Sequence, residues 1–230
     1  MTGAETVNVV NLDELKKKLP KYPGILHREE YINTAVLVLL VFMEGEYHFV
    51  FQKRGPLIRQ GGEICFPGGF HDPEDGSPEQ TAVRETVEEM GIPAHKITVL
   101  GRLDTLIAPM GAVVEAFVGV ADIRGLEEIR ANAEEVEYVF SVPVSYFENN
   151  EPEKFPVLMQ MHPARIDEKT GEEVVLFPAG ELGLPERYSR PWGGMKHTIY
   201  VYRVKENTIW GITAMFIVDV VRKLKRKTTL

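Results

Sequence analysis

The sequence predicts a single α/β domain, and three observations support this prediction. A continuously apolar, β-branched run at residues 35–43 is typical of a strand buried on both faces. A helix with clear start and stop signals occupies residues 78–90, and an amphipathic helix is expected at residues 209–224. The length of 230 residues corresponds to one enlarged domain or to a core with an insertion, because a single domain averages about 150 residues.

The composition is that of an ordinary globular chain. The 26 Lys and Arg residues against 34 Asp and Glu residues give a formal net charge of −8, and 44% of the residues are hydrophobic. This acidic balance provides no general attraction to nucleic acid or to an anionic membrane, so neither is expected as a partner. No apolar run approaches the roughly 20 residues of a membrane-spanning helix. The single cysteine, Cys65, cannot form an intramolecular disulfide, which favours a reducing, cytoplasmic location.

The first part of the chain is divided into an N-terminal helix and arm at residues 1–32 and a core at residues 33–148. A capping box at Asn11 opens a short helix, which Pro20 ends. The buried strand at 35–43 is followed by a Glu-Gly-Glu turn. Aromatic residues then alternate with less consistently apolar ones, which predicts a hairpin partner.

The helix at residues 78–90 has signals at both ends. Ser77 stands at the N-cap, Pro78 at the first helical position and Gln80 at the third, while Gly91 ends the helix. One apolar stripe is expected to face the core, and its members are Val83, Val87 and Met90.

The remaining elements are predicted more coarsely. Strands are expected at residues 97–103, 113–120, 138–142 and 197–204. Residues 149–206 are rich in Pro, Glu and Gly over much of their length and are interpreted as an insertion or lid, with a hairpin around residues 167–171. Residues 207–230 hold the C-terminal helix.

Three carboxylates are crowded onto the helix at 78–90. Glu85, Glu88 and Glu89 stand at i, i+3 and i+4 and therefore share one side of the helix. They lie in its last two turns, where the helix dipole disfavours each anion by roughly 0.3–1 kcal/mol. A solvated acidic face would leave that penalty in place, whereas a hard cation such as Mg²⁺ or Mn²⁺ would remove it. Arg84 can reach Glu88 or the loop acid Asp75 and so hold the carboxylates in place.

A glycine-rich loop precedes this helix. Gly68 and Gly69 allow backbone groups to approach a ligand closely. Arg54, Arg59 and Lys53 lie before this loop and are candidate phosphate ligands. For Arg54 and Arg59, a purely solubilising surface role fits the sequence equally well.

The pattern Arg-Glu-x-x-Glu-Glu-x-Gly at residues 84–91, preceded by Gly68 and Gly69, resembles the Nudix box of the Nudix hydrolases, here spanning residues 68–92. The resemblance implies a Nudix-type α/β/α sandwich with a mixed curved sheet and an insertion before the C-terminal helix. It also implies hydrolysis of a nucleoside diphosphate derivative with Mg²⁺ or Mn²⁺. The residue roles that follow from the resemblance are metal binding by Glu85, Glu88, Glu89 and the Gly69 carbonyl, and orientation of the carboxylates by Arg84.

Water attack on phosphorus also requires a base. Glu85 is the first candidate, and a loop acid is the alternative. The box departs from the family pattern at one place. Five residues separate Gly69 from Asp75, where the family has Glu, and eight residues rather than seven then lead to Arg84.

A narrower similarity links residues 62–69, 101–104, 132–143 and 209–214 to the coenzyme A pyrophosphatase branch. It implies cleavage of coenzyme A or acyl-CoA to 3′,5′-ADP and (acyl-)4′-phosphopantetheine. The expected substrate-binding residues are those of the glycine loop and the arginines that flank it: Arg54, Arg59, Gly68 and Gly69. The match is incomplete at residues 57–62, where Arg59 is shifted by one position and Gln60 replaces a His. ADP-ribose and dinucleotides such as NADH are the alternative substrates. A non-catalytic, nucleotide-binding regulatory module is the alternative of another class, and a homodimer is expected by analogy.

Overall fold

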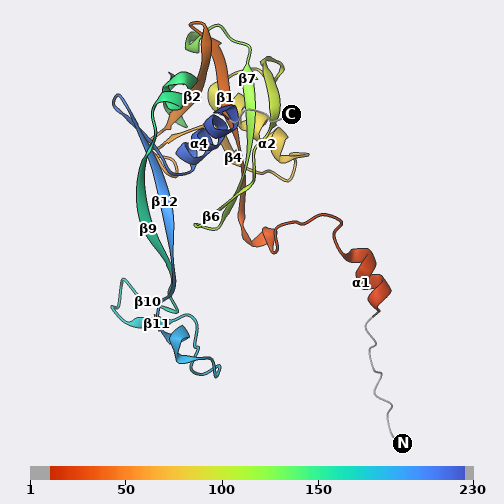
Figure 1. Cartoon of the computed structure of the whole chain (residues 1–230), viewed down its shortest axis with the longest axis vertical. Coiled ribbons are helices and arrows are strands. Elements are labelled where there is room, and N and C mark those ends of the chain that lie inside the picture. Colours follow the sequence, from red (N-terminus) through yellow and green to blue (C-terminus); the bar gives the residue numbers. More distant parts are fainter. Residues whose placement is uncertain (1–10, 226–230) are drawn as a thin grey trace, which may run out of the picture.

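The centre of the molecule is a mixed β-sheet built around one long strand (Figure 1). The structure, a computed structural model, describes residues 11–225. The central strand β1 (Ile32–Met43) runs parallel to β7 (Ala112–Ala121) along one edge and antiparallel to β2 (Glu46–Arg54) on the other. The sheet order is β3-β2-β1-β7-β5, and β4, β6 and β8 pair with β1, β7 and β2. The bounds of these outer strands are β3 Ile64–Cys65, β4 Gly68–Phe70, β5 Ile97–Arg102, β6 Leu106–Ala108 and β8 Val136–Pro143.

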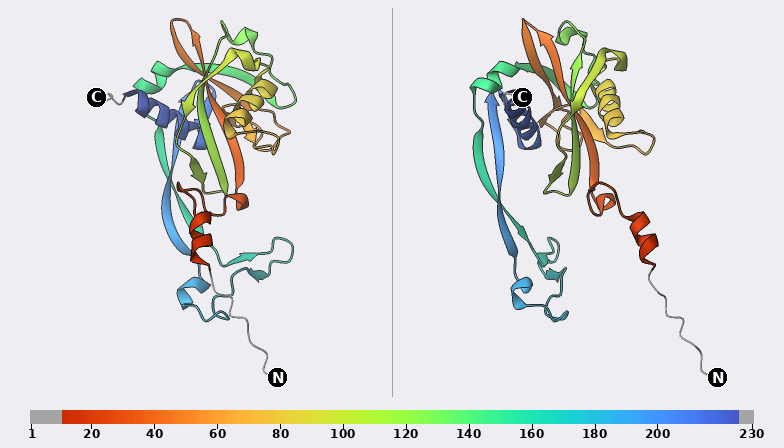
Figure 2. Two further views of the ribbon diagram at one scale, coloured as in Figure 1. Left: turned by 90° about the vertical axis from the view of Figure 1, so that its right-hand side faces the viewer. Right: turned by 45° about the vertical axis from the view of Figure 1, so that its right-hand side comes forward.

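Helices cover both faces of the sheet and make an α/β/α sandwich (Figure 2). Helix α2 (Pro78–Met90) packs on one face, and α4 (Gly211–Lys225) packs on the other together with α3 (Val144–Asn149). This architecture confirms the predicted fold class. The short helix α1 (Leu12–Lys18) buries none of its residues. Single 3-10 turns complete the helical elements, at η1 Arg28–Glu30, η2 Ala94–Lys96, η3 Leu126–Glu128 and η4 Glu186–Ser189.

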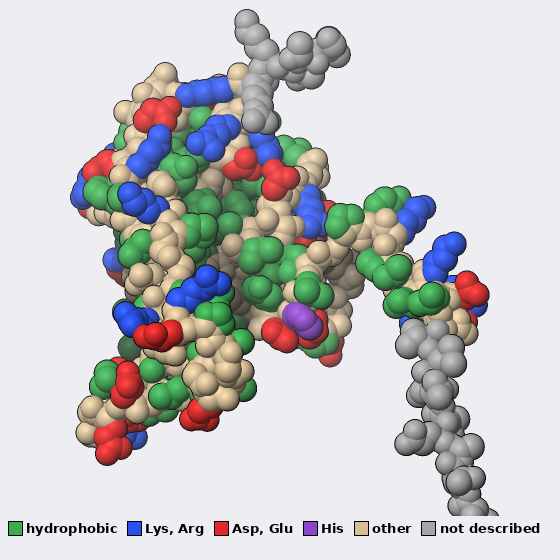
Figure 3. All heavy atoms as spheres, turned by 60° about the horizontal axis from the view of Figure 1, so that its bottom comes forward, with side chains coloured by type: hydrophobic (Ala, Val, Ile, Leu, Met, Phe, Trp, Pro, Cys, Tyr) green, Lys and Arg blue, Asp and Glu red, His purple; other side chains and the backbone are tan. Residues whose placement is uncertain are grey.

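Residues 153–204 form an arm that projects from the sandwich. Strands β9 (Glu153–Met161) and β12 (Trp192–Val204) pair antiparallel along almost their whole length, and β13 (Asn207–Trp210) joins them at the base. The tip carries the small hairpin of β10 (Ala164–Ile166) and β11 (Glu173–Val175). Figure 3 shows hydrophobic side chains over the arm and in the hollow between the arm and the body. The predicted hairpin near residue 167 is confirmed, and the region interpreted as a lid extends away from α2 (Figures 1 and 2).

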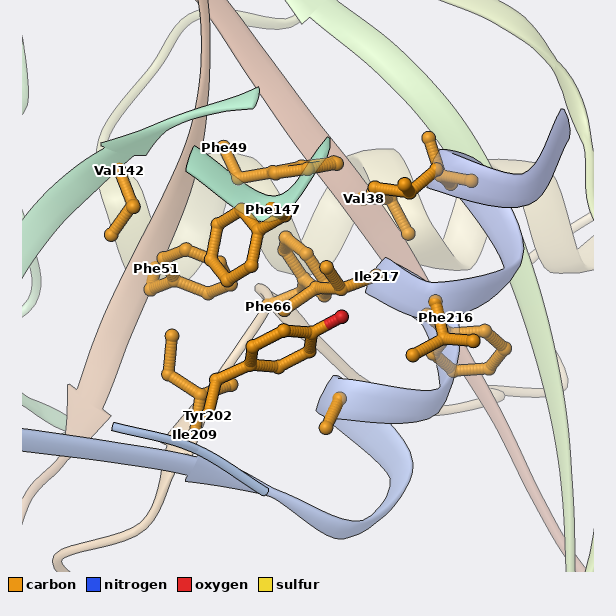
Figure 4. Close-up of a cluster of buried hydrophobic side chains, with 14 of the residues drawn as sticks. Val38, Phe49, Phe51, Phe66, Val142, Phe147, Tyr202, Ile209, Phe216 and Ile217 are labelled. Atoms are coloured by element: carbon orange, nitrogen blue, oxygen red, sulfur yellow. The ribbon is translucent and has the colours of Figure 1, made fainter. Parts of the chain in front are cut away.

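Two hydrophobic clusters hold the sandwich together, one on each face of the sheet. The larger cluster, between the sheet and α4, is aromatic (Figure 4), and Phe147 makes edge contacts there with Phe49 and Tyr202 at centroid distances of 5.6 and 4.9 Å. The smaller cluster packs Leu37, Leu39 and Met90 beneath α2. Because Phe49, Val50 and Phe51 are all fully buried, β2 is covered on both faces and not only on alternate residues.

Two expectations about the helices are wrong in detail. The buried face of α2 is formed by Thr81, Ala82, Thr86, Glu89 and Met90, whereas Val83 and Val87 are only half-buried. The apolar stripe therefore misplaces the core face, because a buried carboxylate and two threonines occupy it. The C-terminal helix begins at Gly211, since residues 207–210 pair with β12 as a strand.

Among residues 11–225, no helix combines the length and the apolar character needed to cross a bilayer.

We expect Phe147→Ala to lower the free energy of unfolding by about 3–5 kcal/mol, because it removes a buried ring from an aromatic cluster that cannot collapse around the cavity. Phe42→Ala is the matched control, since Phe42 is 53% exposed and packs on Tyr47 alone among the aromatic pairs of the described chain. Its cost should stay below about 1.5 kcal/mol. Urea denaturation followed by circular dichroism measures both values, and equal losses would contradict the assignment of the core.

Candidate active site at the glycine strand and helix α2

The site lies where the sheet forks. On the edge of β1 that faces away from β7, residues 40–43 pair with β2 and residues 34–36 pair with β4. Arg54 at the end of β2 and Gly68 at the start of β4 come together at Glu89, which contacts both. Helix α2 packs against β4, which brings its carboxylates to the mouth of the fork.

The two glycines of β4 make this close approach possible. A Cβ on Gly68 would overlap the carbonyl oxygen of Ala35, and a Cβ on Gly69 would lie 2.5 Å from the carboxylate of Glu85. A side chain at Gly68 would push β4 from β1, and one at Gly69 would displace the carboxylate of Glu85 from the strand. The sequence pattern of two glycines before an acidic helix is therefore a packing requirement of the site.

Both ends of α2 are fixed. The Ser77 hydroxyl accepts a hydrogen bond from the Gln80 N–H at 3.2 Å, which confirms the predicted N-cap. At the other end Gly91 adopts a positive φ of 64°, and its N–H donates to the Val87 carbonyl. The N–H of Asn132 donates to the carbonyl of Glu89 at 2.9 Å, so the loop before β8 ties down the last turn. The backbone that carries the acids is rigid as a result.

Glu89 is the most deeply buried of the three acids. Its side chain is 3% exposed, and its Oε2 accepts a hydrogen bond from the Gly68 N–H at 2.9 Å. Burial raises the pKa of Glu89 to about 7, because the charged form loses its hydration. The Gly68 N–H opposes this shift, and so does the guanidinium of Arg54, whose Nη1 lies 3.7 Å from Glu89 Oε1.

Arg84 connects the other acids. Its Nε and Nη2 donate to the two carboxylate oxygens of Asp75 at 2.9 and 3.0 Å, and this pairing holds the pKa of Asp75 well below its usual range. Its Nη1 lies 2.9 Å from Glu85 Oε1 and 2.8 Å from Glu88 Oε2. Arg84 thus contacts both partners that the sequence offered it. The extra residue between Asp75 and Arg84 does not prevent their contact. Asp75 is also held by the helix, because its Oδ2 accepts a hydrogen bond from the Thr81 hydroxyl at 2.8 Å.

The exposed fraction of the three helix acids rises from Glu89 through Glu85 to Glu88. Glu85 is 16% exposed, and burial raises its pKa, while the adjacent Arg84 lowers it. Glu88 is 54% exposed and lies at the rim. Glu135, in the loop before β8, contributes a further negative charge that raises the pKa of Glu85. Sequence reasoning gave Glu135 no catalytic role, although it falls within the stretch similar to the coenzyme A pyrophosphatases.

The donor set fits a hard divalent cation, although it is not assembled around one point. Glu85 and Glu89 are desolvated carboxylates, and burial raises the pKa of each although Arg84 and Arg54 oppose the shift; a cation relieves this cost of burial. Within residues 11–225, no three His, Cys, Asp or Glu side chains converge as a ready-made metal cage. Arg84 occupies the space between Glu85 and Glu88, so a cation there must displace its Nη1.

The structure separates the predicted phosphate ligands. Arg54 lies in the site beside Glu89. Arg59 is exposed, its carbonyl accepts from Arg54 Nε at 3.1 Å, and its guanidinium lies 6.0 Å from the ring of Phe70. Lys53 points elsewhere and pairs with Glu137 at 3.0 Å.

One polar residue of the hairpin β2–β3, Gln52, was missed. Gln52 is fully buried, its amide nitrogen lies 3.6 Å from the Cys65 thiol, and its Oε1 has no hydrogen-bond partner in the described chain. Burial raises the pKa of Cys65 to about 11, so this thiol stays protonated and is a poor nucleophile. The position of Gln52, directly after the apolar residues 49–51, was the available signal for its burial.

Comparison with known proteins identifies the family. The sequence model of the NUDIX domain matches residues 32–161, more than half of the chain. The chain belongs to the Nudix family. This Nudix chain is 39% identical over 140 residues to the peroxisomal coenzyme A diphosphatase NUDT7 of Mus musculus and 38% identical over 141 residues to Nudix hydrolase 3 of Caenorhabditis elegans.

The two alignments cover 59% and 57% of this chain and 58% of each relative, so this Nudix chain spans less than two thirds of their length. Among solved structures, the Nudix hydrolase RenU of M. smegmatis is 27% identical, with a TM-score of 0.41 over 51% of this chain and 73% of that one. The resemblance of the box to the Nudix hydrolases is thereby confirmed.

We expect Asp75→Asn to lower the free energy of unfolding at pH 7 by about 1.5–3 kcal/mol, because Arg84 loses a charged acceptor in a partly buried pair. Asp75 has a lowered folded-state pKa, so its contribution is full above the ordinary value of 3.8 and disappears only as the pH falls through the lower folded value. Urea titrations at several pH values measure the difference in free energy of unfolding between the parent chain and Asp75→Asn. Glu74→Gln, an exposed acid of the same loop, is the control, and an equal loss there would contradict the role of Asp75.

Proposed function

We propose that this Nudix chain is a metal-dependent hydrolase of the diphosphate bond in nucleoside diphosphate derivatives, with coenzyme A or acyl-CoA as the preferred substrate. The observation that carries the proposal is the pair of desolvated carboxylates, Glu85 and Glu89, held against the glycine strand with Arg54 beside them. Such a pair has uncompensated charge on its own and matches a cation bridged to a diphosphate.

The metal role of this site rests on its chemistry and on the family. Nudix hydrolases generally use divalent cations, and Glu85, Glu88, Glu89 and the Gly69 carbonyl would hold Mg²⁺ or Mn²⁺ here. When bound, the cation neutralises diphosphate oxygens and makes water a stronger acid. Arg84 aligns Glu85 and Glu88 through its Nη1, and its bidentate contact with Asp75 fixes the guanidinium.

The attacking water needs a proton acceptor, and the structure narrows the choice. Asp75 is a poor base because its carboxylate is engaged by Arg84 and its pKa lies far below the usual range. Glu85 remains the first candidate, since burial raises its pKa above the ordinary value. Glu135 is the loop acid that can replace it. Arg54 stands nearest to Glu89 and would receive the diphosphate, while Arg59 flanks the entrance.

The preference for coenzyme A rests on two supports. The motif stretches resemble the coenzyme A pyrophosphatase branch, and one relative that is 39% identical over 140 residues carries the name coenzyme A diphosphatase. The departure at residues 57–62 falls on the exposed loop next to Arg54, which is a place where the leaving group would be selected.

We expect Glu89→Gln to lower kcat by at least about 100-fold and to weaken the binding of Mn²⁺. The free energy of unfolding should stay unchanged or rise, because a neutral amide avoids the desolvation of a buried carboxylate. Product chromatography, calorimetry with Mn²⁺ and a thermal melt measure the three quantities. Glu79→Gln, an exposed acid of the same helix, is the control. Unchanged turnover in Glu89→Gln would remove the assigned role.

We expect coenzyme A and acetyl-CoA to be cleaved with a kcat/KM at least about 10-fold above that for ADP-ribose or NADH, because the pocket walls select the leaving group. Chromatography should detect 3′,5′-ADP together with 4′-phosphopantetheine or its acetyl derivative. Faster turnover of ADP-ribose would overturn the substrate assignment and leave the hydrolase intact. Nucleotide binding without turnover of any of the four would instead support the non-catalytic module.

A further inference from the structure

The arm exposes apolar side chains on a scale that the body does not. It is a two-stranded ribbon, and such ribbons are only marginally stable in water without cover. Eleven large hydrophobic residues of the arm on the ladder side and at the tip are between 36% and 62% exposed: Phe155, Val157, Met161, Ile166, Val174, Val175, Leu176, Phe177, Leu182, Leu184 and Met195. Isolated exposed apolar residues need no explanation, but a gathered set indicates a contact surface.

The two faces of the ribbon differ in character. Cross-strand partners share a face, and the pairs Phe155–Ile199, Val157–His197 and Met159–Met195 form one continuous face, which we call the apolar ladder. The opposite face carries the pairs Lys154–Tyr200, Pro156–Thr198 and Leu158–Lys196. At the base of the arm Tyr200 packs this second face against the larger core cluster, and Lys154 and Lys196 mark it as solvated, so the ladder is the face that requires a partner.

The charges around the ladder favour self-association. The ladder itself contains no Asp, Glu, Lys or Arg, so two copies can meet without burying a charge. At its base Arg203 pairs with Glu153 at 2.7 Å, and at the tip Arg190 pairs with Glu186 at 2.7 Å. Because each end carries both signs, an antiparallel arrangement that brings the base of one arm to the tip of another allows opposite charges to meet.

The size of the surface also fits a dimer. An interface of standard size needs about 800 Å² from each partner, of which roughly 60% is apolar. Eleven side chains that are each about half exposed present on the order of 500 Å² of apolar surface, if full burial of one side chain removes roughly 60–120 Å². The arm therefore supplies the apolar share of one such interface.

We infer that the apolar ladder docks against the same ladder of a second copy of this chain, in a two-fold symmetric dimer whose axis passes near the Val157–His197 pair. The tip residues extend the contact on both sides of the axis. This dimer does not depend on the hydrolase activity, because the arm extends away from α2 and the glycine strand (Figure 2).

Sedimentation velocity of the full chain tests the inference over about 1–100 µM. The expected mass is twice the 26.0 kDa of one chain. Phe155→Glu should raise the dissociation constant of the dimer at least about 100-fold, because the symmetric interface would bury two unpaired carboxylates. Met195→Glu, on the other strand of the ladder, should have the same effect. Both side chains are exposed in the single chain, so far-ultraviolet circular dichroism should be unchanged.

Leu158→Glu is the matched control, since Leu158 is 60% exposed on the opposite face of the same strand, and its dimer should persist. Mild oxidation of Val157→Cys should give a covalent dimer, because a residue near a two-fold axis approaches its own copy, while oxidation of the parent chain should give none. A mass of 26.0 kDa at all concentrations would overturn the inference, and so would dissociation by Leu158→Glu but not by Phe155→Glu. Binding of a monomeric chain to lipid vesicles through the ladder would also overturn it.

Discussion

The site depends on one constraint, the burial of carboxylates against the two glycines of β4. The absence of a side chain at Gly68 lets β4 approach β1 closely, with the Gly68 N–H bonded to Glu89, and the same absence at Gly69 admits the carboxylate of Glu85. Burial then keeps these charges short of hydration. The fold holds this arrangement because α2 is fixed at both ends, by Ser77 and by the loop that follows η3.

Arg84 has a second effect besides orientation. It places one positive charge among three carboxylates, Asp75, Glu85 and Glu88, so their charge is only partly compensated, while the buried Glu89 relies on Gly68 and the more distant Arg54. The contrast between the lowered pKa of Asp75 and the raised pKa of Glu89 follows from this division. The loop before α2 and the helix itself thereby carry acids in two electrostatic states: Asp75 has a structural role, and Glu89 is suited to ligand chemistry.

Much of this arrangement could be predicted from local patterns. The capping residues of α2, the buried strand at residues 35–43 and the crowding of Glu85, Glu88 and Glu89 are short-range features, and short-range physics determines them. The core face of α2 could not be predicted, because Thr86 and Glu89 are buried by tertiary contacts that override their polarity. The place of Arg54 beside Glu89, the proximity of Glu135 to Glu85 and the reach of the arm depend on strand pairing between distant segments, which no local period encodes.

The fork in the sheet determines the spacing between Arg54 and the glycines of the site. Arg54 belongs to the strand bonded to residues 40–43 of β1, whereas the glycines belong to the strand bonded to residues 34–36. Arg54 and the two glycines are thus held by separate hydrogen-bonded ladders that share the strand β1. The spacing between Arg54 and the glycines is therefore set by residues 37–39 of β1, which stay paired with β7 throughout. A bend of β1 that changed this spacing would have to bend β7 with it.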